Sequence, residues 1–350
     1  MDEKTAAQMR LLENRLIKRK AHLKKWARRN GIFCYRLYDR DIPEIPLCID
    51  FYEDTQSVRY LVLYLYERPY EKPAEEEKLW LDEAVRTWCD VLQIPHNNVF
   101  MKIRRRQKNR QNEAAQYEKQ NEKDFFITAA ENGLLFSINL SDYLDTGLFF
   151  DHRILREKVR AGAEHKRVLN LFCYTGSFSV YAAAGEARMV ESVDLSNAYL
   201  SLAKKNMKLN GFRSDDKYVF TRSDVIKFLE QKAALMHSPG SQGFDIIILD
   251  PPTFSNSKSS QSVLDINRDW PYLVNMCVSL LNRGGVLYFS TNSRRLVFDI
   301  SKIYCSSGER NFKEKGNIGC RLRADSPSAR GLLARNTIAR DSRAIEAEDI

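Results

Sequence analysis

The sequence predicts an α/β protein, in which a Rossmann-like parallel sheet follows a basic N-terminal helix and a small α+β domain. After His152, apolar strand-like runs alternate with helical stretches, which is typical of a parallel sheet covered on both faces. The chain before that point carries short alternating runs and two helical stretches. The predicted domains are residues 1–31, 32–141 and 142–303, followed by a divergent and disordered tail at 304–350.

Composition narrows the class of protein. The 350 residues are 43% hydrophobic and 29% charged, which is typical of a globular protein with sizeable cores. No apolar run is long enough to span a membrane, and the N-terminus lacks a secretory signal. The seven cysteines form no CxxC pair, so reduced thiols in the cytoplasm are expected rather than disulfides or a zinc cluster. The net charge of +9 favours a polyanionic partner.

The first helix is predicted from about Ala6 to Asn30, with Gly31 as its stop. Apolar residues recur on it at helical spacing, and nine basic side chains lie between them from Arg10 to Arg29. A solvated helix surface and a phosphate-contacting helix explain this pattern equally well. The residues taken as RNA-binding on this helix are Lys24, Lys25 and Arg28.

The α+β domain is predicted from two turn signals and a helix. The strands at Leu47–Phe51 and Val58–Tyr66 flank the turn at Glu53-Asp54, and Pro73 opens the helix Ala74–Leu92. Further strands are expected at Val99–Arg104, Phe125–Thr128 and Leu134–Leu140, the last two joined by Asn132-Gly133.

A second basic run begins within the predicted strand at Val99–Arg104. Its members are Lys102, Arg104, Arg105, Arg106, Lys108 and Arg110. Six like charges in nine positions repel one another, so RNA contact is favoured over a bare solvated loop, with Arg104, Arg105 and Arg106 as the RNA-binding residues. A mobile loop is expected from there to Lys123.

The larger domain is predicted from five strands and four helices. The strands are Val168–Phe172, Val190–Val193, Tyr218–Thr221, Asp245–Leu249 and Val286–Ser290. The helices are Phe178–Ala184, Ala198–Asn210, Val225–Lys232 and Pro271–Leu280. Ligands of open α/β sheets bind at the carboxyl ends of such strands.

The loop after the first of these strands reads Asn170-Leu-Phe-Cys-Tyr-Thr-Gly-Ser-Phe178. A tight glycine turn before a helix allows close approach of a ligand to the backbone. Because the loop has one glycine rather than G-x-G-x-x-G, an NAD site is disfavoured. A plain strand–helix turn is the alternative.

Acidic residues follow the next strands. Asp194, at the tip of the second strand, is placed to accept hydrogen bonds from ribose hydroxyls, and Asp224 could bind an adenine amino group. The alternative for both is a helix N-cap. After the fourth strand comes Asp250-Pro251-Pro252-Thr253-Phe254, whose prolines fix the backbone and leave carbonyls pointing outward, a rigid acceptor cluster that suits a base.

This order of motifs resembles the class I S-adenosylmethionine-dependent methyltransferases from Asp142 to about Arg295. More closely, Asp142–Arg153, Asn170–Ser177 and Asp250–Lys258 resemble the guanine-N7 methyltransferase half of the bacterial bifunctional 23S rRNA methyltransferases K/L. The basic helix and Cys34–Asp39 are similar to the same half.

The resemblance implies a cofactor, S-adenosylmethionine, and a partner, 23S rRNA, with no metal and no membrane. The implied cofactor-binding residues are Tyr143, Thr146, Gly147, Asp151, Arg153, Asn170, Phe172, Tyr174, Thr175, Gly176, Ser177, Asp194, Leu195, Ser196, Asp224 and Asp250. The implied catalytic, base-gripping residues are Asp250, Pro251, Pro252, Thr253 and Phe254. Lys258 joins the residues expected to bind RNA.

The resemblance implies methylation of guanine N7, whose lone pair needs no general base, so catalysis would be mainly positioning. Consistently, no His/Asp pair is evident beside Asp250, and His152 is expected to pack locally. One alternative is a 5-methylcytosine enzyme, but neither 253–256 nor 289–293 holds the required cysteine nucleophile. Another is an RNA-binding protein with an impaired methyltransferase domain.

The tail keeps that last alternative open. The relatives continue with two strands that close the sheet, whereas no strand-like alternation is evident here after about Ser301. Without them the fifth strand would have an exposed edge. A shifted reading frame near Tyr304 is one hypothesis for the abrupt change of composition.

Overall fold

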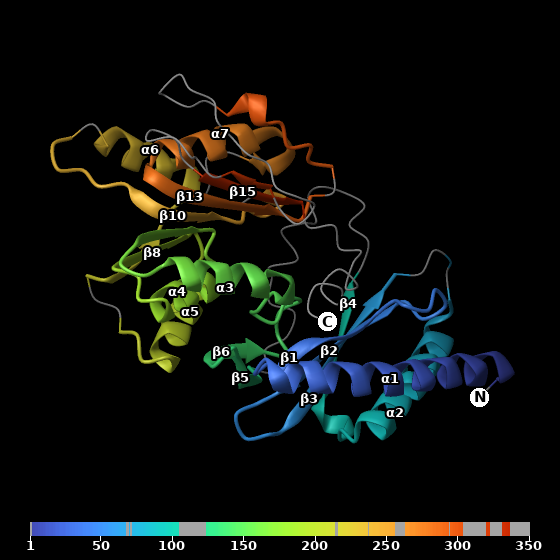
Figure 1. The fold of residues 1–350 in the computed structure, drawn as a ribbon. Coiled ribbons are helices and arrows are strands. Elements are labelled where there is room, and N and C mark those ends of the chain that lie inside the picture. Colours follow the sequence, from blue (N-terminus) through green and yellow to red (C-terminus); the bar gives the residue numbers. More distant parts are fainter. Residues whose placement is uncertain are drawn as a thin grey trace. The chain divides into compact units, whose positions relative to one another are not determined.

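The computed structural model describes residues 2–67, 70, 72–104, 124–213, 216–236, 238–255, 263–293, 295–303, 320–322 and 331–336. The chain forms two compact units, residues 1–151 and 152–350 (Figure 1). The boundary therefore follows Asp151 rather than Ser141, the last residue of the predicted accessory domain. The segment after Ser141 stays with the first unit because the buried Lys102 donates from Nζ to the carbonyls of Tyr143 and Leu144.

The first unit begins with the long helix α1 (Glu3–Arg29). It starts three residues before the predicted position, because the carboxylate of Asp2 accepts a hydrogen bond from the backbone N–H of Thr5 and caps the helix. The apolar face of α1 is buried together with α2 (Ala74–Leu92), which has the predicted bounds. Trp80 Nε1 on α2 donates to Gln8 Oε1 on α1 at 2.8 Å.

Four strands of this unit form one sheet in the order β1-β2-β3-β4. They are β1 (Cys34–Asp39), β2 (Leu47–Glu53), β3 (Arg59–Tyr66) and β4 (Val99–Arg104). The pairs β1–β2 and β2–β3 are antiparallel, and β4 runs parallel to β3 after α2 and the 3-10 turn His96–Asn98. The predicted hairpin of β2 and β3 is confirmed, whereas β1 lies outside the predicted strands.

A separate hairpin pairs β5 (Phe126–Glu131) with β6 (Leu134–Asn139). Its two turn residues, Asn132 and Gly133, have φ values of 52° and 79°. Positive φ at both positions is what a two-residue hairpin turn demands, and the Asn-Gly pair supplies it. The predicted turn is therefore confirmed.

The second unit contains the predicted Rossmann-like parallel sheet. Its strands β7 (Arg167–Leu171), β8 (Met189–Asp194), β9 (Tyr218–Arg222), β10 (Phe244–Leu249) and β13 (Leu281–Thr291) lie in the order β13-β10-β7-β8-β9, each parallel to its neighbour. Helices α3 (Arg153–Gly162), α4 (Ser177–Ala184) and α5 (Asn197–Leu209) lie on one face, and α6 (Val225–Leu235) and α7 (Ile266–Ser279) lie on the other (Figure 1). The core therefore sits between sheet and helices on both sides.

Two helices of this unit differ from the predictions. Helix α3 was not predicted. Helix α7 starts at Ile266, five residues before Pro271, and the proline lies inside it. The side chain of Asp265 accepts from the backbone N–H of Asn267 and caps the helix, so the proline is not the start signal.

The C-terminal segment 304–350 contains two strands that were not predicted. Strand β15 (Gly331–Asn336) runs parallel to β13, and β14 (Cys320–Leu322) runs antiparallel to β15. The backbone N–H and C=O groups along β13 gain hydrogen-bond partners in this way, which is the physical reason for a strand there. The prediction of a disordered tail at 304–350 is thus wrong for 320–322 and 331–336, and the rest of 304–350 lies outside the described residues.

Candidate cofactor and substrate site

The three predicted motifs of the second unit meet at one edge of its sheet. Leu249 of β10 pairs with Leu171 of β7, which pairs with Val193 of β8, and Val193 pairs with Thr221 of β9. Since these strands are parallel and in register, their carboxyl ends lie side by side. Asp250 and Phe172 directly follow β10 and β7, and Asp194 and Arg222 are the last residues of β8 and β9.

The loop after β7 is tightly curled. Phe172, Tyr174 and Gly176 all have left-handed φ values of 52°, 50° and 71°. A Cβ atom on Gly176 would stand 2.7 Å from Cβ of Ala203 on α5, so this position accepts only glycine. Buried Asn206 on α5 donates from Nδ2 to the carbonyl of Thr175 at 2.8 Å. The conformation of the loop is therefore fixed by its contacts with α5. The loop leads directly into α4, which begins at Ser177.

Asp194 ties this loop to the end of β8. Its Oδ2 accepts from the backbone N–H of Tyr174 at 3.0 Å, and its Oδ1 accepts from that of Ser196 at 2.9 Å. The helix cap is instead Ser196, whose side chain accepts from Tyr199 N–H. Burial raises the pKa of the Asp194 carboxyl, and the backbone N–H bonds offset part of that rise. Leu195 accepts from Arg222 Nε through its carbonyl.

Two other predicted residues have structural roles. Asp224 caps α6, because its Oδ1 accepts from the N–H groups of Ile226 and Lys227, so the helix-cap alternative is confirmed for this residue. Asn170 is buried within β7 and donates from Nδ2 to Ser179 Oγ, which is 2.8 Å from Ser192 Oγ. This polar chain joins β7, α4 and β8 behind the loop.

The carboxylate of Asp250 is held on two sides. Ser290 Oγ on β13 donates to Oδ1 at 2.5 Å, and Nδ1 of His152 lies 3.4 Å from Oδ2. The His152 ring is buried and packs at 5.5 Å between centroids against Phe178. The expectation that no His/Asp pair accompanies Asp250 is therefore wrong, because the fold brings together residues far apart in the chain.

The rest of the Asp-Pro-Pro segment is anchored by its backbone. Pro251 is buried and Pro252 is half-buried. The carbonyl of Thr253 accepts from Ile266 N–H, and Phe254 pairs with Asp265 in the short ladder of β11 (Phe254–Ser255) and β12 (Leu264–Asp265). Phe254 is half-buried, so part of its ring surface remains accessible.

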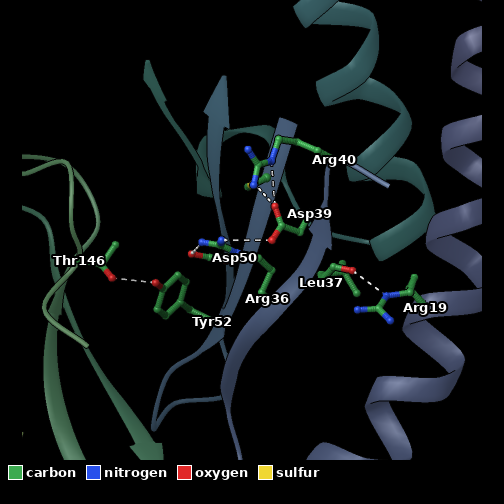
Figure 2. Close-up of polar contacts among 9 residues, drawn as sticks. Arg19, Arg36, Leu37, Asp39, Arg40, Asp50, Tyr52 and Thr146 are labelled. Atoms are coloured by element: carbon green, nitrogen blue, oxygen red, sulfur yellow. Dashed lines mark hydrogen bonds and ion pairs between the residues drawn. The ribbon is translucent and has the colours of Figure 1, made fainter. Parts of the chain in front are cut away.

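Four predicted cofactor residues belong to the first unit. Figure 2 shows Thr146 Oγ1 against the hydroxyl of Tyr52, 2.8 Å away, and the Thr146 carbonyl accepts from Asn139 N–H. Gly147 has a φ of 111°, a conformation that favours glycine. Tyr143 accepts from Lys102 through its carbonyl, and Asp151 is half-buried. Arg153 begins α3 in the second unit. Roles for these residues in cofactor binding remain predictions.

The predicted RNA-binding residues separate into different groups. Lys24 and Arg28 line a pocket of the first unit, whereas Lys25 is exposed and does not line it. Arg104 ends β4, opposite Tyr66 of β3. Lys102, counted in the same basic run, is buried and is not available to RNA. Arg105, Arg106 and Lys258 lie outside the described residues.

The thiols and possible metal ligands complete the chemistry of the described residues. Cys34, Cys48, Cys89, Cys173 and Cys277 are buried and form no disulfide with one another. Burial, followed by the charge of Asp194, raises the pKa of Cys173 well above its usual value, so this thiol is a poor nucleophile. Within the described ranges no group of His, Cys, Asp or Glu is arranged to hold a metal ion, and no helix is long and apolar enough to cross a membrane.

Sequence reasoning missed His152, Ser290, Asn206 and Ser179 as members of this site. His152 belongs to the segment Asp142–Arg153, but only the order of the strands in the sheet brings Asp250 beside it. No signal in the sequence marks the other three, since serine and asparagine inside apolar elements are common.

Comparisons of the sequence with known proteins identify the relatives of this chain. The S-adenosylmethionine-dependent methyltransferase family model matches residues 82–302. Ribosomal RNA large subunit methyltransferase K of Neisseria meningitidis serogroup B is 46% identical over 288 residues, which are 82% of this chain and 77% of that protein. Ribosomal RNA large subunit methyltransferase K/L of Magnetococcus marinus is 42% identical over 81% of this chain, which spans only 37% of that longer protein.

Solved structures show the same fold. The structure of SMU.776, described as a methyltransferase complexed with SAH, has a TM-score of 0.65 at 23% identity and covers 90% of this chain and 76% of its own. A structure from Streptococcus mutans, described as a SAM-dependent methyltransferase, has a TM-score of 0.64 at 22% identity and covers 92% of this chain and 77% of its own.

The residues present fit S-adenosylmethionine as the cofactor. The curled loop with its obligatory glycine allows close approach, and the carboxylate of Asp194 is fixed at the end of the second strand, where ribose hydroxyls need acceptors. The chain therefore belongs to the S-adenosylmethionine-dependent methyltransferase family, among relatives that include the ribosomal RNA large subunit methyltransferases K and K/L.

Proposed function

We propose that this protein methylates N7 of a guanine in 23S rRNA in the cytoplasm. The observation that carries the proposal is the carboxylate of Asp250, which is held by Ser290 beside the cofactor loop at the edge of the sheet. The names of the K and K/L relatives, which refer to the large-subunit ribosomal RNA, support RNA as the substrate.

Cofactor binding falls to residues at the ends of the first three parallel strands. Asp194 would accept from the ribose hydroxyls, the loop Phe172–Ser177 would hold the methionyl part, and Asp224 with the segment after it would lie near the adenine. Bound S-adenosylmethionine supplies an electrophilic methyl group on a sulfonium.

The guanine would be held by acceptors and by an aromatic face. The carboxylate of Asp250 is an acceptor suited to the N1–H and N2–H edge of guanine, and the half-buried ring of Phe254 can stack on a flipped base. Guanine N7 attacks with its own lone pair and loses no proton. The protein therefore has to orient the base and exclude water rather than remove a proton, which is catalysis by positioning.

The 5-methylcytosine alternative conflicts with the thiols of the site. That reaction needs a cysteine thiolate to add to the ring. The described segments directly after β10 (residues 250–255) and after β13 (residues 292–293) hold no cysteine, and Cys173 in the cofactor loop is buried with a raised pKa. The observation favours attack by a ring nitrogen.

The proposal is tested by mass mapping of methylated nucleosides after the protein acts on unmodified 23S rRNA. We expect 7-methylguanosine at one site, and about 100-fold less of it per unit time with Asp250→Asn, since a carboxylate bond to the base would be lost. Calorimetry with S-adenosylmethionine separates the two implied roles of Asp250, because a loss of cofactor affinity in that variant would come from its cofactor-binding role. A new 5-methylcytidine would refute the base assignment, and RNA binding without any methylation would favour the impaired module.

A further inference from the structure

A pocket outside the methyltransferase unit has the chemistry of a nucleotide site. It lies in the first unit, between α1, the start of β1, β2 and β3. Its cationic members are Lys20, Lys24, Arg28 and Arg59, and Glu53 is the one acidic residue that lines it. Aromatic and aliphatic side chains form the rest of its wall.

The positive charges of the pocket repel one another, and a bound polyanion would reduce this repulsion. Lys20, Lys24 and Arg28 follow one another at four-residue spacing, so they lie on the same face of α1 and repel one another. Burial, followed by the charges of Lys24 and Arg59, lowers the pKa of Lys20. Arg59 Nε is 2.8 Å from Glu53 Oε2, which leaves an excess of positive charge around the pocket.

The aromatic wall is partly exposed. Phe33 remains 39% accessible, although aromatic residues of this size are usually covered. The Tyr35 and Phe51 rings, 5.1 Å apart between centroids, lie beside it in the pocket wall. Burial raises the pKa of Tyr35 to about 12, so its hydroxyl stays protonated and can donate.

The walls are held in place by hydrogen bonds. Phe33 N–H donates to the carbonyl of Ala130, and the Phe33 carbonyl accepts from Glu53 N–H at 2.8 Å. Arg19 Nε on α1 donates to the carbonyl of Leu37 on β1 (Figure 2). Lys20 Nζ donates to the carbonyl of Val91 at the end of α2. The pocket is therefore formed before any ligand enters.

We infer that this pocket binds one unstacked nucleotide of a single-stranded segment of the RNA substrate, with the base against Phe33 and the phosphates at Lys24, Arg28 and Arg59. An aromatic face and a cationic rim are the recognition elements for single-stranded nucleic acid. The carboxylate of Glu53 favours the base, which has N–H donors, over a phosphate in the interior. A base inside a duplex cannot reach such a pocket. The inference rests on the proposed action on RNA.

The test is fluorescence anisotropy of the full chain with a labelled single-stranded oligouridylate at several salt concentrations. Phe33→Ala should weaken binding by about 5- to 100-fold, the loss of one stacked base, without changing the salt dependence. Phe33→Tyr should retain binding. Lys24→Ala or Arg28→Ala should each lower the slope of log K against log salt by about 0.7. An RNA duplex should compete poorly.

Control variants distinguish binding in this pocket from nonspecific electrostatic attraction between the basic protein and RNA. Lys18→Ala removes an exposed charge from the same helix but outside the pocket, so it should change the affinity less than Lys24→Ala. Thermal melts would verify that Phe33→Ala is folded, as its exposure leads us to expect. The inference is overturned if folded Phe33→Ala binds like the wild type, if Lys18→Ala equals Lys24→Ala, or if polyglutamate displaces the RNA as well as unlabelled oligouridylate does.

Methylation assays distinguish the failure of this inference from that of the proposed function. Phe33→Ala should raise the KM for RNA and leave kcat at saturating RNA unchanged, because the pocket lies outside the methyltransferase unit. Absence of 7-methylguanosine with wild-type protein, together with the expected binding pattern, would refute the proposed function alone. Normal methylation with binding insensitive to Phe33→Ala would refute the pocket alone.

Discussion

The Nδ1 atom of His152 lies 3.4 Å from Oδ2 of Asp250, while Ser290 Oγ donates to Oδ1 of the same carboxylate. His152 precedes α3, Asp250 follows β10, and Ser290 lies on β13. The carboxylate that is proposed to grip the base is therefore oriented by two other elements of the same unit. Its orientation, rather than its presence alone, should set the rate.

Ser290→Ala tests that orientation. Loss of a hydrogen bond to a charged group is worth about 1.5–3 kcal/mol, so kcat should fall by about 10- to 100-fold. Calorimetry should show unchanged cofactor affinity, since Ser290 does not belong to the cofactor loop. Ser279→Ala removes an exposed hydroxyl that bonds only its own helix, and should be neutral. Equal kcat in Ser290→Ala and wild type would contradict the positioning role.

Gly176→Ala should damage both the fold and the cofactor loop. The alanine would adopt a φ of +71° and place its Cβ 2.7 Å from that of Ala203, so we expect about 2–4 kcal/mol of lost stability. Gly211→Ala is the matched control, because it has a φ of +79° with open space around the new Cβ and should lose only about 1 kcal/mol. Urea unfolding measures both, and equal losses would show that the contact with Ala203 is readily relieved.

The affinity for S-adenosylmethionine should depend on pH through Asp194. Its pKa is raised by burial, and the ionised form is the acceptor for ribose hydroxyls. The affinity should therefore be constant near neutral pH and fall as the pH drops through the raised pKa, beginning above the range in which an ordinary aspartate titrates. Calorimetry across pH measures this.

Asp194→Asn supplies the comparison for that measurement. The variant should bind the cofactor weakly at neutral pH and lose the acid-dependent decline, because it has no carboxyl to titrate. Asp90→Asn, at an exposed position on α2, should keep the wild-type profile. An unchanged decline in Asp194→Asn would assign the titration to another group.

Lys102→Met should lower the free energy of unfolding and leave RNA binding unchanged. The change removes the buried donor to the carbonyls of Tyr143 and Leu144, and unsatisfied buried acceptors cost about 1–3 kcal/mol each. Urea unfolding should show that loss, while the folded variant binds oligouridylate with the wild-type salt dependence. Lys25→Ala should leave stability unchanged. A smaller salt slope in Lys102→Met at full stability would instead show that Lys102 contacts RNA.

Much of the second unit was predictable because its signals are local. The strand periods and the turn at Gly176 are encoded in neighbouring residues, and the parallel sheet then requires that Asp194 and Asp250 lie at one edge. Asn132-Gly133 was predictable for the same reason, since two positive φ values select those residues. The start of α7 was misjudged because Asp265 and Pro271 are competing local signals, and capping by Asp265 decided between them.

By itself, the sequence determined the parallel sheet, the positions of its loops and the residues that those loops present. Only the tertiary structure decided which side chains became partners. It brought His152 next to Asp250, and it buried Lys102 against the carbonyls of Tyr143 and Leu144. It also placed Lys24 and Arg28, but not Lys25, in the wall of the pocket that Phe33 lines. The physical reason is that periodicity and turn preferences depend on residues next to one another, whereas a contact between distant residues depends on strand order and on packing between elements.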